Sequence, residues 1–224
     1  MGLRKIGLTV LGVVTLACGF YLYKLHSLAL IGNKIFEQRC LNVNPHLIRY
    51  KNSFLKFADY LNNPKKYSDD EVKTFLEGYI SEMRAYVPEE DKWLEAEQKY
   101  IHRWDFKLIE PWYIKEASVY QLEMYKGYRD EAFYMLELYD SKTQGEEFST
   151  KFAEARDRRS KYVGLYEDIF DKAVSLRDWR KIFGTVPVPA GCTDKNTIIP
   201  DTSGSINWGT FTPIPISKNP EIVS

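Results

Sequence analysis

Residues 6–23, IGLTVLGVVTLACGFYLY, form a continuous apolar run that contains no charged residue. At 1.5 Å of rise per residue, a helix of this length is roughly 27 Å long, close to the hydrocarbon thickness of a bilayer. A buried helix of a soluble protein would normally carry a polar stripe, and this run shows none. Residues 1–24 are therefore predicted to be a transmembrane segment, with residues 6–23 in contact with the membrane.

The charges on either side of this run predict its orientation. Arg4 and Lys5 precede it, and Lys24 and His26 follow it. Basic residues are enriched on the cytoplasmic side of membrane segments, so we expect the N-terminus in the cytoplasm and the rest of the chain outside it. The chain has no Asn-x-Ser/Thr glycosylation site, which favours a bacterial envelope. The predicted protein is single-pass, in a bacterial inner membrane, with its body in the periplasm.

The sequence leaves three alternatives open for residues 6–23: a retained signal anchor, a cleaved signal peptide or a lipoprotein signal. A retained signal anchor is preferred, because a cleaved signal peptide usually has an apolar core of only about 7 to 15 residues. Cleavage would be expected after residues 27–29 (SLA). Residues 14–18 (VTLAC) resemble a bacterial lipobox, which implies a lipid on Cys18, but the family pattern has Leu where this chain has Thr15. All three fates place the body on the same side of the membrane.

Residues 25–184 are predicted to form a helical bundle. Apolar residues recur at helical spacing throughout this region, and no strand pattern interrupts them. The last two segments, about 111–140 and 146–183, are long and joined by a short loop, which favours antiparallel packing. The predicted fold class is all-α: a transmembrane helix followed by an extracytoplasmic bundle of about five helices.

Local signals set the predicted helix limits within this bundle. Ser68 and Glu71 have the spacing of a capping box and predict a helix start. Residues 42–45 (NVNP) predict a turn, and Val87-Pro88 predicts the end of one helix and the start of the next.

The last part of the chain, residues 185–224, has a different composition. It contains six of the ten prolines and shows neither a helical nor a strand period. We expect an irregular Pro/Gly-rich tail that is partly packed on the bundle.

The chain has three cysteines, Cys18, Cys40 and Cys192. With Cys18 in the membrane, Cys40 and Cys192 remain as a pair in a compartment that permits disulfides. The sequence leaves two alternatives open, a disulfide between them or two unrelated thiols.

Charge and motifs exclude several classes of function. Three of the 31 basic residues lie in residues 1–24 and none of the 31 acidic ones, so the body carries a small acidic excess. This balance does not favour nucleic-acid binding. No two histidines lie within one helical turn, and no Glu-x-x-His, Cys-x-x-Cys or glycine-rich phosphate loop occurs. We therefore predict no catalytic residue, cofactor or metal site, and expect a protein that is not an enzyme. The basic run at residues 156–161 is interpreted as a solvated helix face.

Aromatic residues are dense between residues 100 and 139, and four of them are candidates for a contact surface: Trp112, Tyr113, Tyr120 and Tyr128. Tyr and Trp are effective anchors at protein interfaces. The alternative is a wide helix buried on two sides within its own bundle. The sequence thus predicts a membrane-anchored protein that acts through a protein partner in the envelope, as an assembly factor, an inhibitor or an immunity-type module. The alternatives are a ligand-binding or sensory bundle that signals through a partner, and a bacterial lipoprotein of the same fold.

Overall fold

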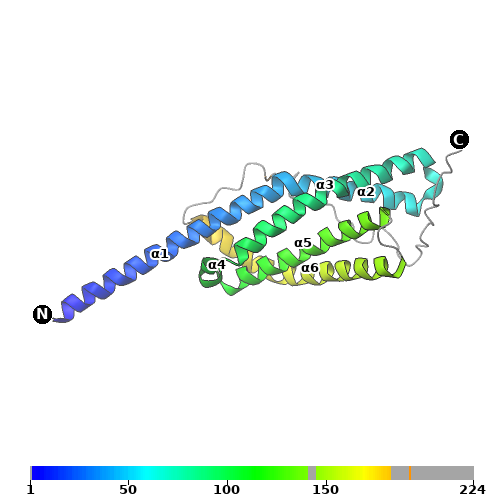
Figure 1. Cartoon of the computed structure of the whole chain (residues 1–224). Coiled ribbons are helices and arrows are strands. Elements are labelled where there is room, and N and C mark those ends of the chain that lie inside the picture. The colour runs from blue at the N-terminus through cyan, green and yellow to red at the C-terminus, as the bar shows by residue number, and fades with distance from the viewer. Residues whose placement is uncertain (1, 141–144, 183–191, 193–224) are drawn as a thin grey trace.

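The computed structural model describes residues 2–140, 145–182 and 192, and this part of the chain is helical apart from short connections. Within these residues no strand occurs, so the all-α prediction is confirmed for them. The elements are α1 (Gly2–Gln38), the π-helix η1 (Arg39–Val43), α2 (Asn44–Asn62), the short 3-10 helix η2 (Pro64–Lys66), α3 (Asp69–Ile101), α4 (Trp104–Ile109), α5 (Trp112–Tyr139) and α6 (Gly145–Ile182) (Figure 1). Apart from Cys192, the predicted tail lies outside the described residues.

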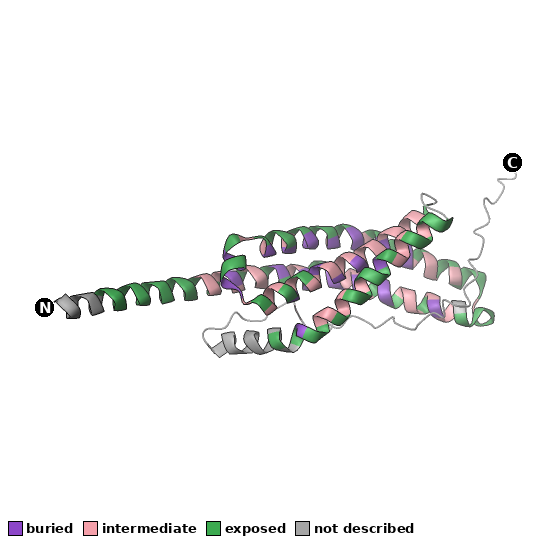
Figure 2. Ribbon diagram, turned by 90° about the horizontal axis from the view of Figure 1, so that it is seen from below, coloured by how far each residue is buried: buried purple, intermediate pink, exposed green. Residues whose placement is uncertain are grey.

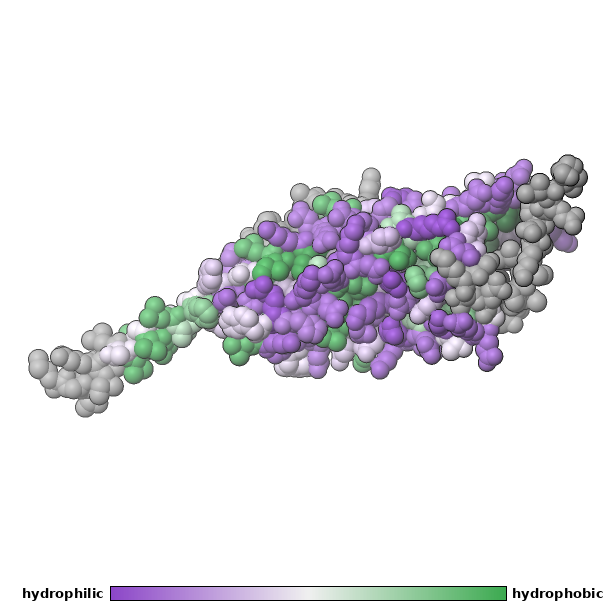
Figure 3. Space-filling model, in the orientation of Figure 1, coloured by the Kyte–Doolittle hydropathy of each residue, from purple (hydrophilic) through white to green (hydrophobic). Residues whose placement is uncertain are grey.

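Helix α1 projects from the body, and its outer part is apolar and exposed (Figures 2 and 3). Phe20 is 56% exposed and Leu16 is 76% exposed. The best 18-residue window has a mean hydropathy of 1.4, and only 6% of it is buried, whereas the core helix of a soluble protein would be mostly buried. By length and composition, α1 is long and apolar enough to cross a membrane.

Helices α1 and α2 are joined by η1 without a break, so the turn predicted at residues 42–45 is wrong. The backbone N–H of Asn44 donates to the carbonyl of Arg39, five residues back, which is the π-helical pattern. Pro45 follows directly. It has no N–H to donate to the carbonyl of Leu41, and its ring would clash there in a regular α-helix. The wider turn accommodates the proline and lets the helix continue.

Helix α3 begins as predicted. Ser68 and Glu71 form both hydrogen bonds of the capping box. The predicted break at Val87-Pro88 is wrong, because α3 continues through Pro88 to Ile101. Pro88 is exposed, while Met83 and Trp93 on either side of it are buried. Packing on both sides of the proline offsets its cost of about 3 kcal/mol in a helix interior.

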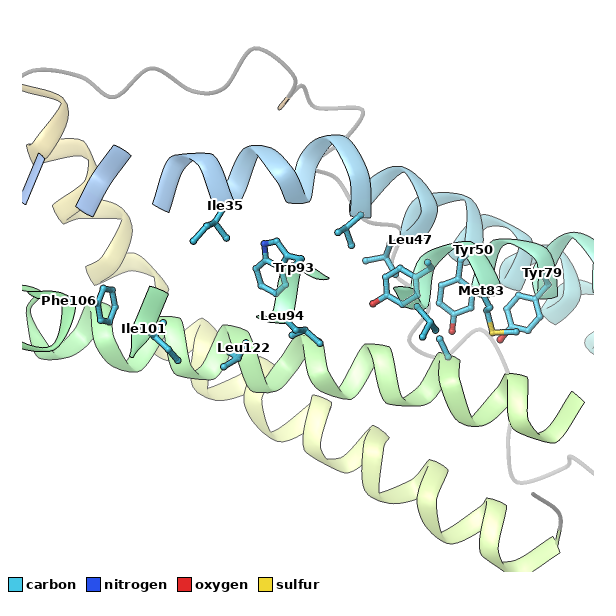
Figure 4. Packing of buried hydrophobic residues seen from close by; sticks show 14 of the residues in the cluster. Ile35, Leu47, Tyr50, Tyr79, Met83, Trp93, Leu94, Ile101, Phe106 and Leu122 are labelled. Atoms are coloured by element: carbon cyan, nitrogen blue, oxygen red, sulfur yellow. The ribbon is translucent and has the colours of Figure 1, made fainter. Parts of the chain in front are cut away.

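The core follows the length of the bundle. The labelled side chains in Figure 4 extend from Phe106 and Ile101 at one end to Tyr50 and Tyr79 at the other, with Trp93 between them. These residues come from α2, α3 and α4, and α5 adds residues such as Leu122 from the other side.

Helix α6 packs mainly on α5, and the two approach closely at one glycine. A Cβ built on Gly127 would lie 2.7 Å from the Cβ of Arg159 and 2.9 Å from the carbonyl oxygen of Ala155. Only glycine allows this approach without a backbone shift. It places the side chain of Arg159 beside α5.

Candidate functional site

A pocket of about 70 Å³ lies where α2, α3, α5 and α6 meet. It has room for several water molecules or for a small anion. We call it the cationic pocket, and it is lined by Tyr50, Lys51, Phe54, Tyr79, Tyr128, Glu131, Met135, Phe152, Arg156 and Arg159.

The charges of this lining are unbalanced. Three side chains, Lys51, Arg156 and Arg159, are cationic, and one, Glu131, is acidic. Arg159 and Glu131 form an ion pair with Nε and Oε1 2.7 Å apart. Lys51 is only 5% exposed, and its Nζ lies 4.3 Å from the centre of the Tyr128 ring. Arg156 is exposed, and its Nε lies 4.0 Å from Oδ1 of Asp157. Lys51 and Arg159 are therefore the cations that lie in a partly desolvated space, where electrostatic attraction is stronger than in water.

Burial changes the ionisation of the other groups in the pocket. It raises the pKa of Glu131, although Arg159 and Lys51 act in the opposite direction. It also raises the pKa of Tyr50, Tyr79 and Tyr128 above the usual value for a phenol. These hydroxyl groups therefore stay protonated at neutral pH and can act as neutral hydrogen-bond donors. Protonated phenols next to lysine and arginine suit a negatively charged ligand.

A second charged group, which we call the arginine cluster, is closed to solvent. It consists of Arg39 from η1, Glu90, Trp93 and Glu97 from α3, and Tyr125 from α5. Arg39 donates from Nη1 to Oε1 of Glu90 at 2.9 Å, and both side chains are almost completely buried. The guanidinium carbon lies 4.1 Å from the centre of the Trp93 ring and 3.3 Å from that of Tyr125. These aromatic faces replace the water that the cation has lost.

Glu97 is the second carboxyl group near Arg39 and is 7% exposed. Burial raises the pKa of Glu97 to about 7, and the attraction of Arg39 only partly offsets this effect. Burial also raises the pKa of Glu90, against the influence of Arg39. With one fully enclosed ion pair, the arginine cluster has no open side for a ligand, so we interpret it as structural.

The structure places Cys40 and Cys192 in bonding contact, with their Cα atoms 5.2 Å apart. This separation is typical of a disulfide. The contact is consistent with the first of the two alternatives that the sequence leaves open, a disulfide between these residues. It connects η1 to a residue 152 positions further along the chain. Cys18 is exposed on the projecting part of α1.

The four aromatic residues predicted as one contact surface do not lie together. The ring of Tyr120 packs against Tyr162 of α6, with centroids 6.0 Å apart. Tyr128 lines the cationic pocket. Tyr113 makes an edge contact with Trp112, which is 58% exposed. Tyr120 and Tyr128 therefore lie against α6, whereas Trp112 remains largely exposed.

The sequence reasoning missed the pocket. The basic run at residues 156–161 predicts a solvated face, and Arg158 fits this prediction, since it is exposed and its Nη1 lies 2.8 Å from Oδ2 of Asp130. Arg159, one position later, lies against α5 instead, and Lys51 gave no signal of its own. The one available signal is Gly127, because a glycine inside a long helix allows close approach of a neighbouring helix such as the one that carries Arg159. In the described residues no group of three or more His, Cys, Asp or Glu side chains could hold a metal ion.

Comparisons with protein-family models, with curated proteins and with solved structures gave no match. The class of protein follows from the architecture alone: a helical bundle that carries one helix capable of crossing a membrane.

Proposed function

We propose that this protein is a membrane-anchored helical bundle that binds a small anion, or the phosphate or carboxylate group of a small ligand, in the cationic pocket. The observation that carries this proposal is the gathering of three cationic side chains around one pocket, among them the nearly buried Lys51. Phosphate and carboxylate groups match the forked donors of arginine and the protonated phenols around them.

The anchor and its orientation belong to the same proposal. The α1 segment crosses the membrane with its N-terminus in the cytoplasm, and the body lies in the periplasm as a bundle with long antiparallel helices. Three observations support it: the exposed apolar surface of α1, the basic residues before it, and the contact between Cys40 and Cys192, which suits an oxidising compartment.

The position of Lys51 favours a sensory or ligand-dependent role. Lys51 lies on the continuous helical segment that begins in α1, about 42 Å beyond Tyr23 at 1.5 Å per residue. A ligand in the cationic pocket would thus contact the same helical segment that enters the membrane, as well as α5 and α6. A signal from this ligand would pass to a partner through that segment.

The test is a phosphate titration of the detergent-solubilised full chain, followed by thermal unfolding. A ligand at a hundredfold excess over its Kd adds about 2.7 kcal/mol of stability. We expect phosphate to raise the Tm of the wild type and to have no such effect on Lys51→Met, which removes the buried cation but keeps the apolar stem. The matched control is Lys56→Met, because Lys56 is exposed on the same helix.

Sodium chloride at the same ionic strength controls for screening. An equal rise of Tm with chloride, or an unchanged phosphate effect in Lys51→Met, would overturn the pocket assignment. Citrate and phenyl phosphate, titrated in parallel, tell a carboxylate from a phosphate preference.

Contact with a protein partner in the envelope is the second candidate function. The observation that favours it is the exposure of Trp112 beside Tyr113. Co-purification from solubilised membranes, with wild type compared to Trp112→Ala/Tyr113→Ala, tests it. A stoichiometric protein lost only in the variant would support this function.

A further inference from the structure

Three large apolar side chains at one end of the body are the most exposed outside α1, among the side chains that the structure describes. Trp104 is 61% exposed, Leu108 75% and Trp112 58%. Trp104 and Leu108 lie four residues apart on α4, so they share one face of this short helix, and Trp112 opens α5. We call these three residues the α4 patch.

The α4 patch lies at the level where the apolar run of α1 ends. The Nζ of Lys24 is 5.1 Å from the centre of the Trp104 ring and 3.5 Å from Oδ2 of Asp105. The hydroxyl of Tyr21 donates to the carbonyl of Ile109 at 3.5 Å. Figure 1 shows α4 beside α1 at the end of the body from which α1 projects. If the apolar run crosses a bilayer, α4 lies at the bilayer surface.

The chemistry of the patch suits the boundary between headgroups and acyl chains. Tryptophan is enriched there because its ring has an apolar body and a polar edge. Two lysines flank the patch: Lys107 is exposed on α4, and Nζ of Lys172 lies 5.7 Å from the Trp112 ring. Lysines near a membrane surface attract anionic headgroups. The carboxyl group of Asp105 is buried and paired with Arg103 and Lys24, so it does not oppose this attraction.

We propose that the α4 patch is a lipid-contact surface that inserts among the headgroups of the leaflet in which α1 ends. This inference rests on the membrane anchor of the proposed function. The argument for lipid as the occupant is continuity, since the patch adjoins the exposed apolar surface of α1 through Lys24 and Tyr21. With a second contact beside α1, the body stands in one fixed orientation on the membrane, and the cationic pocket is held away from it.

The test uses the full chain reconstituted into vesicles of phosphatidylcholine with a minor share of phosphatidylglycerol. Part of the phosphatidylcholine is brominated on acyl carbons close to the headgroup, so that it quenches tryptophans located at that depth. We expect clear quenching of wild-type fluorescence and the loss of most of it in Trp104→Phe/Trp112→Phe. Circular dichroism and the Cys40–Cys192 bond confirm that each variant is folded.

A matched pair of charge substitutions separates lipid contact from general surface effects. Leu108→Asp should expel the patch from the headgroups and reduce quenching of Trp104. Leu41→Asp should not, because Leu41 is 49% exposed but lies on η1, about 25 Å further along the helix than Lys24.

Resistance of the reconstituted chain to alkaline extraction reports whether α1 spans the bilayer. If the chain resists extraction but Trp104 and Trp112 remain unquenched, the lipid contact is overturned while the anchor of the proposed function stands. If the chain is extracted, the anchor itself fails, and the lipid contact fails with it. Unquenched tryptophans that crosslink to another protein in native membranes would likewise overturn the lipid assignment.

Discussion

The arginine cluster and the cationic pocket both bury charge, but they do so in opposite ways. In the cluster, Arg39 and Glu90 are enclosed, balanced by each other and covered by aromatic rings. In the pocket, Lys51, Arg156 and Arg159 outnumber Glu131 and border on an open space. A closed ion pair holds helices together, whereas a group of cations that borders an open space can accept an anionic ligand from solution.

The largest effect is expected for the disulfide beside Arg39. In the chain-entropy model, a crosslink over 152 residues stabilises the fold by about 5 kcal/mol. Cys40→Ser/Cys192→Ser should lower the free energy of unfolding by this order, measured by denaturant titration in detergent. Cys18→Ser is the control and should leave it unchanged. Two free thiols trapped in the wild type would contradict the bond.

Loss of the buried cation should come next. Arg39→Met leaves Glu90 buried without its partner, which typically costs about 3–5 kcal/mol. The double variant Arg39→Met/Glu90→Leu should recover most of the loss, because it removes the orphaned charge. Lys51→Met in the pocket should lower the free energy of unfolding by less, because Glu131 keeps its ion pair with Arg159. If Arg39→Met and Lys51→Met lower the free energy of unfolding equally, the cluster is no more structural than the pocket.

Glu97 makes the stability of the cluster depend on pH. Burial raises its pKa from 4.5 to about 7 in the folded protein, so the folded state holds the proton more tightly than the unfolded state. The protonated Glu97 therefore stabilises the folded state fully below about pH 4.5, and this stabilisation is lost as pH rises through 7. The change in the free energy of unfolding is about 3 kcal/mol. Glu97→Gln should match the wild type at pH 4 and exceed its Tm at pH 8.

Glu95→Gln provides the control for this titration. Glu95 is exposed on the same helix, and its hydrogen bond with Lys99 lowers its pKa. Glu95→Gln should give no gain of Tm at pH 8. Wild-type and Glu97→Gln curves that stay parallel from pH 4 to pH 8 would show that Glu97 is not held protonated.

The smallest effect concerns the helix contact that positions Arg159 in the pocket. Gly127→Ala should cost about 1–3 kcal/mol, because the new methyl group meets the α6 backbone. It should also weaken the phosphate response by moving Arg159. Gly164→Ala, with nothing within 4 Å of its Cβ, should instead gain up to about 1 kcal/mol from helix propensity. Identical effects of the two changes would argue against close packing at Gly127.

The sequence predicted local features well where the signal was local. The apolar run, the capping box at Ser68 and the long helices α5 and α6 follow from composition and period over neighbouring residues. The prediction of helix ends was wrong at Pro45 and Pro88, because a proline ends a helix only when packing of the flanking residues does not keep the helix continuous. Packing of distant residues against both sides of Pro88, and the π-turn before Pro45, have no local signature.

A helical chain with one segment able to cross a membrane can be predicted from the sequence alone, because hydrophobicity and residue spacing are local properties of the chain. Which charges are buried can be seen only in the folded protein, since burial depends on residues far apart in sequence. Arg39 meets Glu90 across 51 residues, and Arg159 reaches Glu131 because α6 lies against Gly127. The same packing turned Tyr120 and Tyr128 toward α6 and left Trp104, Leu108 and Trp112 exposed.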